Sequence, residues 1–143
     1  MLKKIFFLTA ITLSLTMLQA KPGKKKSDNL PLLNTKWVLE KIDDSPIFFN
    51  GVDTAYIVFS ENYKFSGNFS CNIFFGEFSF GKKRIKLDYV GATKKICADM
   101  YVEECFFKAI KNDITHYYIE KNNLYLLYKL KVVCKFRGIE IND

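Results

Sequence analysis

The sequence has little histidine and little proline, with one His and three Pro among its 143 residues. A single histidine excludes metal sites built from histidine clusters, and any Ser-His-Asp or Cys-His catalysis would depend on His116 alone. The chain is instead 49% hydrophobic and 16% aromatic, which excludes a disordered or collagen-like protein. This length and composition predict one globular domain with a large apolar core.

The formal charge of +7 is concentrated at the amino terminus. Six of the 22 basic residues lie before Leu30, against one of the 15 acidic residues, so the rest of the chain is nearly balanced. Phe65 and Phe69 alternate with polar neighbours as on a core-facing strand, which does not favour a stacking platform for nucleic acid. We therefore expect no nucleic-acid partner.

The amino terminus resembles a secretory signal peptide. Lys3 and Lys4 precede an apolar run, broken only by Thr and Ser, that ends shortly before Ala20. The run is about 14 residues long, short of the roughly 20 that a membrane-spanning helix needs. We predict a signal peptide at 1–20, a Lys-rich flexible tether at 21–29 and a folded domain at 30–143. No cysteine follows the run, so we expect a periplasmic or secreted protein without a lipid anchor; a retained signal acting as an anchor is the alternative.

Alternating apolar and polar residues predict strands in most of the body. The clearest alternation, from Tyr63 to Phe75, predicts a strand that contains the glycosylation-like Asn68-Phe69-Ser70 and places Asn72 on its polar face. A shift of the apolar positions after Gly76 predicts a bulge or a strand break. The other predicted strands are Trp37–Ile42, Tyr56–Phe59, Ile85–Tyr89, Tyr117–Glu120, Leu124–Tyr128 and Val132–Phe136.

One amphipathic helix is predicted behind Asp99, which would cap it, and ahead of Asn112-Asp113, which would end it. Glu103 and Glu104 fit the start of this helix, and as adjacent residues they point in different directions and form a poor acid/base pair. A single helix cannot connect a parallel sheet of this size, so we predict a mainly β (α+β) fold. It would be a small curved antiparallel sheet or a partly open β-barrel with one helix packed on it. The apolar stripe of the helix consists of Tyr101, Val102, Cys105, Phe106, Ala109 and Ile110.

An ordered set of motifs resembles the META domain, the HslJ-like family of bacterial heat-shock-associated envelope proteins. The resemblance implies a small β-rich fold, an association with stress or drug tolerance that includes novobiocin resistance, and no established enzymatic activity. It implies structural roles for Trp37, Gly67, Asn72, Gly76 and Thr93. The family usually has Gly where this chain has Ser70, and many members carry a lipid-acceptor Cys that is lacking here. The motifs are Trp37-Val38-Leu39, Phe65-Ser66-Gly67-Asn68-Phe69-Ser70-Cys71-Asn72 with Gly76, Thr93-Lys94-Lys95-Ile96-Cys97, the helix with Glu104, and Leu124-Tyr125-Leu126.

Export would place all four cysteines in an oxidising compartment, and four cysteines allow three disulfide connectivities. The resemblance implies Cys71–Cys97 as the first pair. Cys105 and Cys134 are then either a second disulfide or two buried, small apolar residues. The gaps between the cysteines do not resemble a zinc site, so we expect no metal and no cofactor.

Few other residues are candidates for chemistry. His116 is expected to be a structural or solvated histidine, because no nucleophile or carboxylate can be placed beside it from the sequence. The basic turn Lys82-Lys83-Arg84, with Lys86, fits solubility better than an anionic partner.

The sequence therefore predicts a non-enzymatic exported module, monomeric, with an unknown envelope protein or small ligand as partner, and the resemblance to the META domain family implies a role in envelope stress or drug tolerance. The alternatives are a small-ligand or enzyme-inhibitor module and an undiscovered hydrolase or redox enzyme.

Overall fold

The computed structural model describes residues 28–47, 55–98, 100–111 and 114–141. The predicted signal peptide, most of the predicted tether, the predicted helix cap Asp99 and the predicted helix end Asn112-Asp113 lie outside the described residues.

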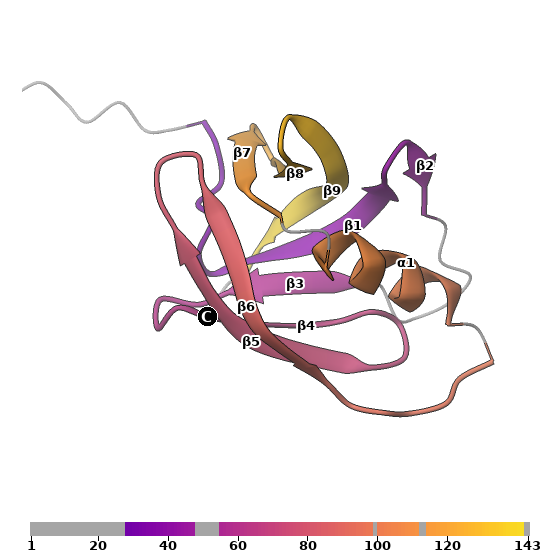
Figure 1. Ribbon diagram of the computed structural model, residues 1–143. Helices are drawn as coiled ribbons and strands as arrows, with labels where there is room; N and C mark the ends of the chain where they lie inside the picture. Colours follow the sequence, from indigo (N-terminus) through magenta and orange to yellow (C-terminus); the bar gives the residue numbers. More distant parts are fainter. Residues whose placement is uncertain (1–27, 48–54, 99, 112–113, 142–143) are drawn as a thin grey trace, which may run out of the picture.

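The described chain forms one antiparallel sheet with one helix, as predicted (Figure 1). The order of the strands is β6-β5-β4-β3-β1-β9-β8-β7, and the short β2 pairs with β1. The elements are β1 (Thr35–Ile42), β2 (Ser45–Pro46), β3 (Tyr56–Phe59), β4 (Lys64–Asn68), β5 (Ile73–Phe80), β6 (Ile85–Ala92), α1 (Tyr101–Lys111), β7 (His116–Glu120), β8 (Asn123–Tyr128) and β9 (Lys131–Glu140).

The two ends of the sheet meet and nearly close it into a barrel. Arg84 and His116 form an isolated antiparallel bridge between the start of β6 and the start of β7. The amide of Ile85 donates to the carbonyl of Thr115 at 3.2 Å, and that of Tyr117 donates to the carbonyl of Lys83 at 2.9 Å. These few bonds join β6 to β7 only near the start of each strand, so the rest of the β6 edge is not paired with β7.

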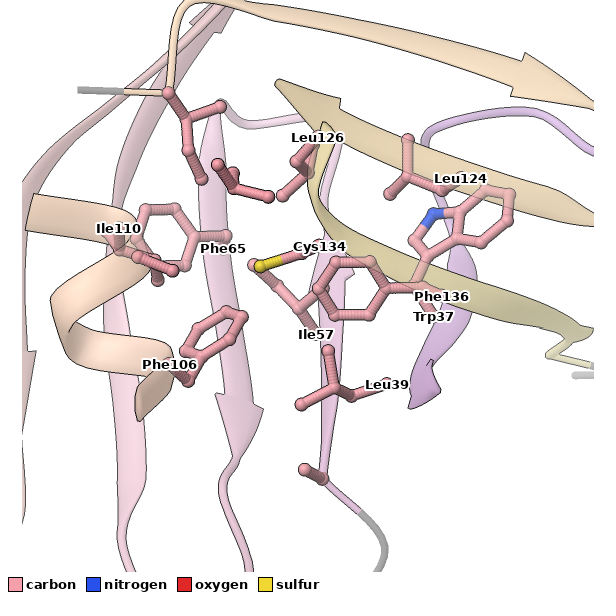
Figure 2. Packing of buried hydrophobic residues seen from close by; sticks show 14 of the residues in the cluster. Trp37, Leu39, Ile57, Phe65, Phe106, Ile110, Leu124, Leu126, Cys134 and Phe136 are labelled. Atoms are coloured by element: carbon pink, nitrogen blue, oxygen red, sulfur yellow. The ribbon is translucent and has the colours of Figure 1, made fainter. Parts of the chain in front are cut away.

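The interior of the curved sheet is filled by aromatic and aliphatic side chains. Phe106 of α1 reaches inward and packs against Phe69, Phe74 and Phe136, with ring centroids 3.6, 5.7 and 6.0 Å away (Figure 2 shows Phe106 and Phe136). The helix therefore plugs the barrel with its apolar face. The largest fully buried apolar side chains are Trp37, Phe59, Phe65, Phe69, Phe74, Phe106, Phe136, Leu39, Ile57, Leu124 and Leu126.

The long strand predicted from Tyr63 to Phe75 is wrong, because a turn at residues 69–72 divides it into β4 and β5. The turn exchanges the faces of the sheet. Phe65 is buried in β4, whereas Ile73 and Phe75 are 50% and 53% exposed and Phe74 is buried. Six strands therefore precede the helix, β2 included, where the sequence predicts about four. A register irregularity between Phe75 and Glu77, where β5 pairs with β6, confirms the bulge predicted near Gly76.

Two smaller expectations are also corrected. Tyr101, placed on the apolar stripe of the helix, is 65% exposed, and Cys105 on the same stripe is only half-buried. In the β7–β8 turn, Lys121 has a positive φ of 53°. The side-chain oxygen of Asn29 accepts a hydrogen bond from the Lys121 amide at 2.7 Å, which holds this backbone conformation in place.

Candidate functional site

Four of the residues singled out in the sequence meet where the β4–β5 turn contacts the segment that joins β6 to α1. Cys71 and Cys97 form a disulfide with their Cα atoms 6.1 Å apart. This is the pair that the family resemblance implied. Asn72 follows Cys71 in the turn, and Thr93 opens the segment that ends near Cys97. The disulfide therefore joins two loops that the sheet alone does not connect.

The side chain of Asn72 uses its full hydrogen-bonding capacity at this junction. Its Nδ2 donates to the Lys95 carbonyl at 3.2 Å and to the Glu103 carboxylate at 2.9 Å. Its Oδ1 accepts from the Thr93 hydroxyl at 2.7 Å and from the Lys95 amide at 2.8 Å. An Asn side chain has two donor hydrogens and two acceptor lone pairs, so this amide is saturated. Asn72 is 1% exposed, which corrects its predicted place on the polar face of a strand.

Glu103 supplies a buried carboxylate to the same junction. It is 7% exposed and accepts hydrogen bonds from both the backbone amide and the side-chain amide of Asn72. Charge-assisted bonds of this kind offset part of the cost of burying a carboxylate. Glu103 therefore ties α1 to the β4–β5 turn, a role that its predicted place in the first helical turn did not reveal. We call Asn72, Thr93, Lys95, Glu103 and the disulfide the polar junction.

Ser70, the residue that departs from the family pattern, lies in the same turn with φ at 75°. This is the left-handed region, which a side chain disfavours and glycine enters freely. The structure thus explains why a glycine suits this position and shows that Ser70 adopts the conformation nevertheless.

The remaining motif residues lie in the core. Trp37 is fully buried, and its indole Nε1 donates to the Leu32 carbonyl at 2.9 Å. A Cβ atom on Gly67 would collide with the Tyr56 carbonyl oxygen and the Phe74 ring, and one on Gly76 would lie 2.6 Å from the Phe65 ring. Gly67 and Gly76 therefore allow aromatic rings to pack directly against the backbone.

The other two cysteines, Cys105 and Cys134, are free thiols in different surroundings. Cys134 is fully buried in the core, and this burial raises the pKa of its thiol strongly. Cys105 is half-buried on α1, beside Tyr101, and a hydrogen bond to Cys105 raises the pKa of the Tyr101 hydroxyl. The burial of Cys134 therefore disfavours its thiolate at neutral pH.

His116 lies apart from the polar junction, at the seam between β6 and β7. Its Nδ1 is 2.9 Å from the Thr115 hydroxyl oxygen. It lines an open groove of about 850 Å³ with apolar and basic neighbours, among them Ile85, Leu130 and Arg84. The groove brings His116 together with Arg84 and Lys86 of the predicted basic region, whereas Lys82 and Lys83 do not line it.

The part of the chain that the structure describes lacks two kinds of feature. It has no group of three or more His, Cys, Asp or Glu side chains arranged to hold a metal ion. Within the same residues, no helix has the length and apolarity required to cross a bilayer.

The family model of the META domain matches residues 30–138. The chain is a member of the META domain family. The solved structures similar to this META domain include an NMR structure that is 21% identical, with a TM-score of 0.60 over 74% of this chain and 90% of that one. A second, an NMR structure of a protein from Burkholderia xenovorans, is 19% identical, with a TM-score of 0.58 over 76% and 83% of the two chains. No curated protein sequence matches the chain. At these identities the two structures support the fold of the META domain alone.

Sequence reasoning found Cys71, Asn72, Thr93 and Cys97 in this META domain but missed Glu103 as their partner. The sequence does contain a signal for this role, which is the position of Glu103 on the face of the helix that is buried. Glu103 lies one turn before Phe106 and two turns before Ile110 on the buried face of the helix, so helical spacing would have allowed it to face inward.

Proposed function

We propose that this META-domain protein is an exported module that acts by contact with a partner molecule rather than by catalysis, and that it protects the bacterial envelope during stress, including exposure to novobiocin. The observation that carries the proposal is the saturated polar junction. Asn72 and Glu103, the buried polar groups that a catalytic site would need to be available, satisfy one another and hold a surface segment in place. Their chemistry is used for positioning.

Export is supported by two independent features. The amino terminus has the order of a signal peptide, and the Cys71–Cys97 bond belongs to a class of crosslink that persists in oxidising compartments. Mass measurement of the exported protein with and without reduction tests this part. The expected result is a chain that begins at Lys21, carries one disulfide and has no lipid; a chain that retains residues 1–20 contradicts cleavage after Ala20.

The protective role is tested in a strain that lacks the gene. We expect growth in novobiocin and survival of a heat challenge to fall, and both to be restored by the normal gene. A His116→Ala variant is expected to restore them equally, because His116 is outside the polar junction and has no catalytic role in the proposal. Identical behaviour of the deletion strain and its parent would contradict the protective role, and failure of His116→Ala alone would contradict the absence of catalysis.

A second candidate, binding of a small ligand, is favoured by the groove beside His116 rather than by the barrel interior. The interior is filled by Trp37, Phe106, Phe136 and their neighbours, which argues against an enclosed ligand. The groove combines apolar side chains with Arg84 and Lys129, a lining suited to an amphiphilic anion. Dodecanoate should then shift the NMR signals of Ile114 and Leu130, and the absence of any shift at millimolar concentration removes this candidate.

A further inference from the structure

The segment that joins β6 to α1, residues 93–98, lies outside the sheet and is held along only one side. Figure 1 shows it as a wide arc between the end of β6 and the start of α1. It has no regular secondary structure, and all six residues are exposed. We call it the crossover segment.

Alternate residues of the crossover segment are tied to the body of the protein. The Thr93 hydroxyl donates to Asn72 Oδ1 at 2.7 Å. The amide and carbonyl of Lys95 both bond to the Asn72 side chain, at 2.8 and 3.2 Å. Cys97 is bonded covalently to Cys71. A tie at every second residue is the pattern of an extended strand, in which successive side chains point to opposite sides.

The residues between these ties face solvent. Ile96 is 99% exposed, the most exposed of the large apolar side chains in the described part of the chain. The backbone amides of Lys94 and Ile96 donate no hydrogen bond to any other residue of the described part of the chain. An aliphatic side chain displayed between two fixed neighbours has already lost most of the backbone freedom that binding would remove.

We propose that the crossover segment is an inhibitory loop that enters the substrate cleft of an exported peptidase of the elastase type, with Ile96 in the primary specificity pocket. The proposal rests on the proposed function, because it names the partner of an exported contact module. Protein partners that accept an added strand pair with its backbone and take alternate side chains into pockets. Peptidase–inhibitor complexes form between surfaces that are ordered before they meet. A branched aliphatic side chain fits a short apolar pocket, and Lys94 and Lys95 favour an acidic rim beside it.

The two ties on either side of Ile96 explain why such a loop would inhibit rather than serve as a substrate. If the peptide bond between Ile96 and Cys97 were cut, the new carboxyl end would stay attached through Lys95 and Asn72. The new amino end would stay attached through the Cys97–Cys71 bond. Both ends remain in the cleft, so release is slow and the bond can re-form. In this proposal the polar junction has a second role besides anchoring the segment, because it keeps both ends of a cut loop attached to the protein.

The test uses the exported, oxidised protein with pancreatic elastase as the probe. We expect stoichiometric inhibition, and Ile96→Asp should raise the inhibition constant by about 30-fold or more, the loss expected when a central anchor residue is removed. Leu130→Asp is the matched control, because Leu130 is an aliphatic side chain that is 91% exposed on the β8–β9 turn, away from the segment. It should leave inhibition unchanged.

Two further variants test the pocket and the bracing. Ile96→Lys should weaken inhibition of elastase and strengthen inhibition of trypsin, each by about tenfold or more, because the primary pocket selects this side chain. The double variant Cys71→Ala with Cys97→Ala should convert the loop into a substrate that elastase cuts at Ile96. This variant keeps the native side chain in place and isolates the contribution of the tie.

The proposal is overturned if a tenfold excess of oxidised protein leaves elastase fully active, or if the oxidised loop is cut as fast as the doubly substituted one. It is also overturned if the chain forms a homodimer that Ile96→Asp dissociates into monomers, since the segment would then be the contact between two copies of this chain. A protein that fails to inhibit while its deletion strain remains sensitive to stress overturns the inhibitory loop alone. The protective role is contradicted only by the deletion strain itself.

Discussion

The barrel core and the crossover segment are held in place by different physics. In the core, Trp37, Phe106 and their neighbours are stabilised by removal of apolar surface from water, a contribution that is spread over many contacts. The crossover segment contributes no large side chain to that core. It is held by one disulfide, by the side-chain amide of Asn72 and by two hydrogen bonds between Thr93 and the Ile73 backbone, so its order is concentrated in a few atoms. The core should therefore tolerate many small changes, whereas the segment should respond sharply to single substitutions.

The largest expected effect comes from removing the aromatic plug. Phe106→Ala should lower the free energy of unfolding by about 4 kcal/mol, because it deletes a fully buried ring that contacts Phe69, Phe74 and Phe136. Urea denaturation followed by tryptophan fluorescence, with Trp37 as the probe, measures this loss. The core and the segment should unfold together. A loss below 1 kcal/mol would contradict the plugging role of α1.

Removal of the disulfide should affect the segment first. Cys71→Ala with Cys97→Ala opens a connection across 26 residues, which corresponds to about 3 kcal/mol of chain entropy in the unfolded state. Trypsin should now cut at Lys94 and Lys95 while the barrel stays folded at moderate temperature. Cys105→Ala is the control, because Cys105 is a free thiol, and it should leave this cleavage unchanged.

The Asn72–Glu103 contact should show a coupling that a surface pair would not. Asn72→Asp keeps the shape of the side chain but replaces the donor hydrogens that bond to the Glu103 carboxylate and to the Lys95 carbonyl with oxygen lone pairs. We expect a loss of about 2–3 kcal/mol. Glu103→Gln should recover part of that loss in the double variant, and thermodynamic cycles measure the coupling. Additive losses would show that the two side chains act independently.

The buried thiol of the core should appear in the pH dependence of stability. Burial raises the pKa of Cys134 in the folded state above the ordinary value of 9.0, so the unfolded thiol loses its proton first. The contribution of the buried thiol to the free energy of unfolding is fully present below pH 9. It is lost as the pH rises further, at up to about 1.4 kcal/mol per pH unit. Between pH 8 and 10, the free energy of unfolding should therefore fall more steeply with pH for the natural chain than for Cys134→Ala, as measured by denaturation at each pH. Equal slopes would contradict the burial of an intact thiol.

The smallest expected effect is a gain. Ser70→Gly should stabilise the turn by about 0.5–1 kcal/mol, because the backbone φ of 75° strains a residue with a side chain. The control is Ser66→Gly in β4, where the backbone is extended and glycine should cost a similar amount. Thermal denaturation of the two variants should shift in opposite directions.

Some elements of the fold could be predicted from the sequence and others could not. The strand at Tyr56–Phe59 follows from a short apolar run and the helix from Tyr101 follows from helical periodicity, and both signals depend only on residues near one another. The turn at Phe69–Asn72 was missed because Phe69, Cys71, Ile73 and Phe75 keep the apolar spacing of a single strand across it. Which of these faces the core depends on how β4 pairs with β5, and pairing is not local information.

The polar junction shows the same limit for the site. The resemblance pointed to Asn72 and Thr93 as structural residues, and the chemistry of an amide indicates what such a residue can bind. The partners of Asn72 are Lys95 and Glu103, which lie 23 and 31 positions after it in the chain. No spacing rule connects these positions, because the path between them passes through two strands and a loop. Only the folded chain brings the carboxylate to the amide.

The sequence by itself determined the class of fold, one helix among antiparallel strands, because the periods of helices and strands are written in neighbouring residues. It also determined that a nearly balanced body follows a basic amino terminus. The tertiary structure decided which polar groups are buried, where the sheet closes, and that Ile96 is displayed between two fixed residues. These features arise from contacts between residues distant in the chain, and their free energies exist only when the whole barrel is formed.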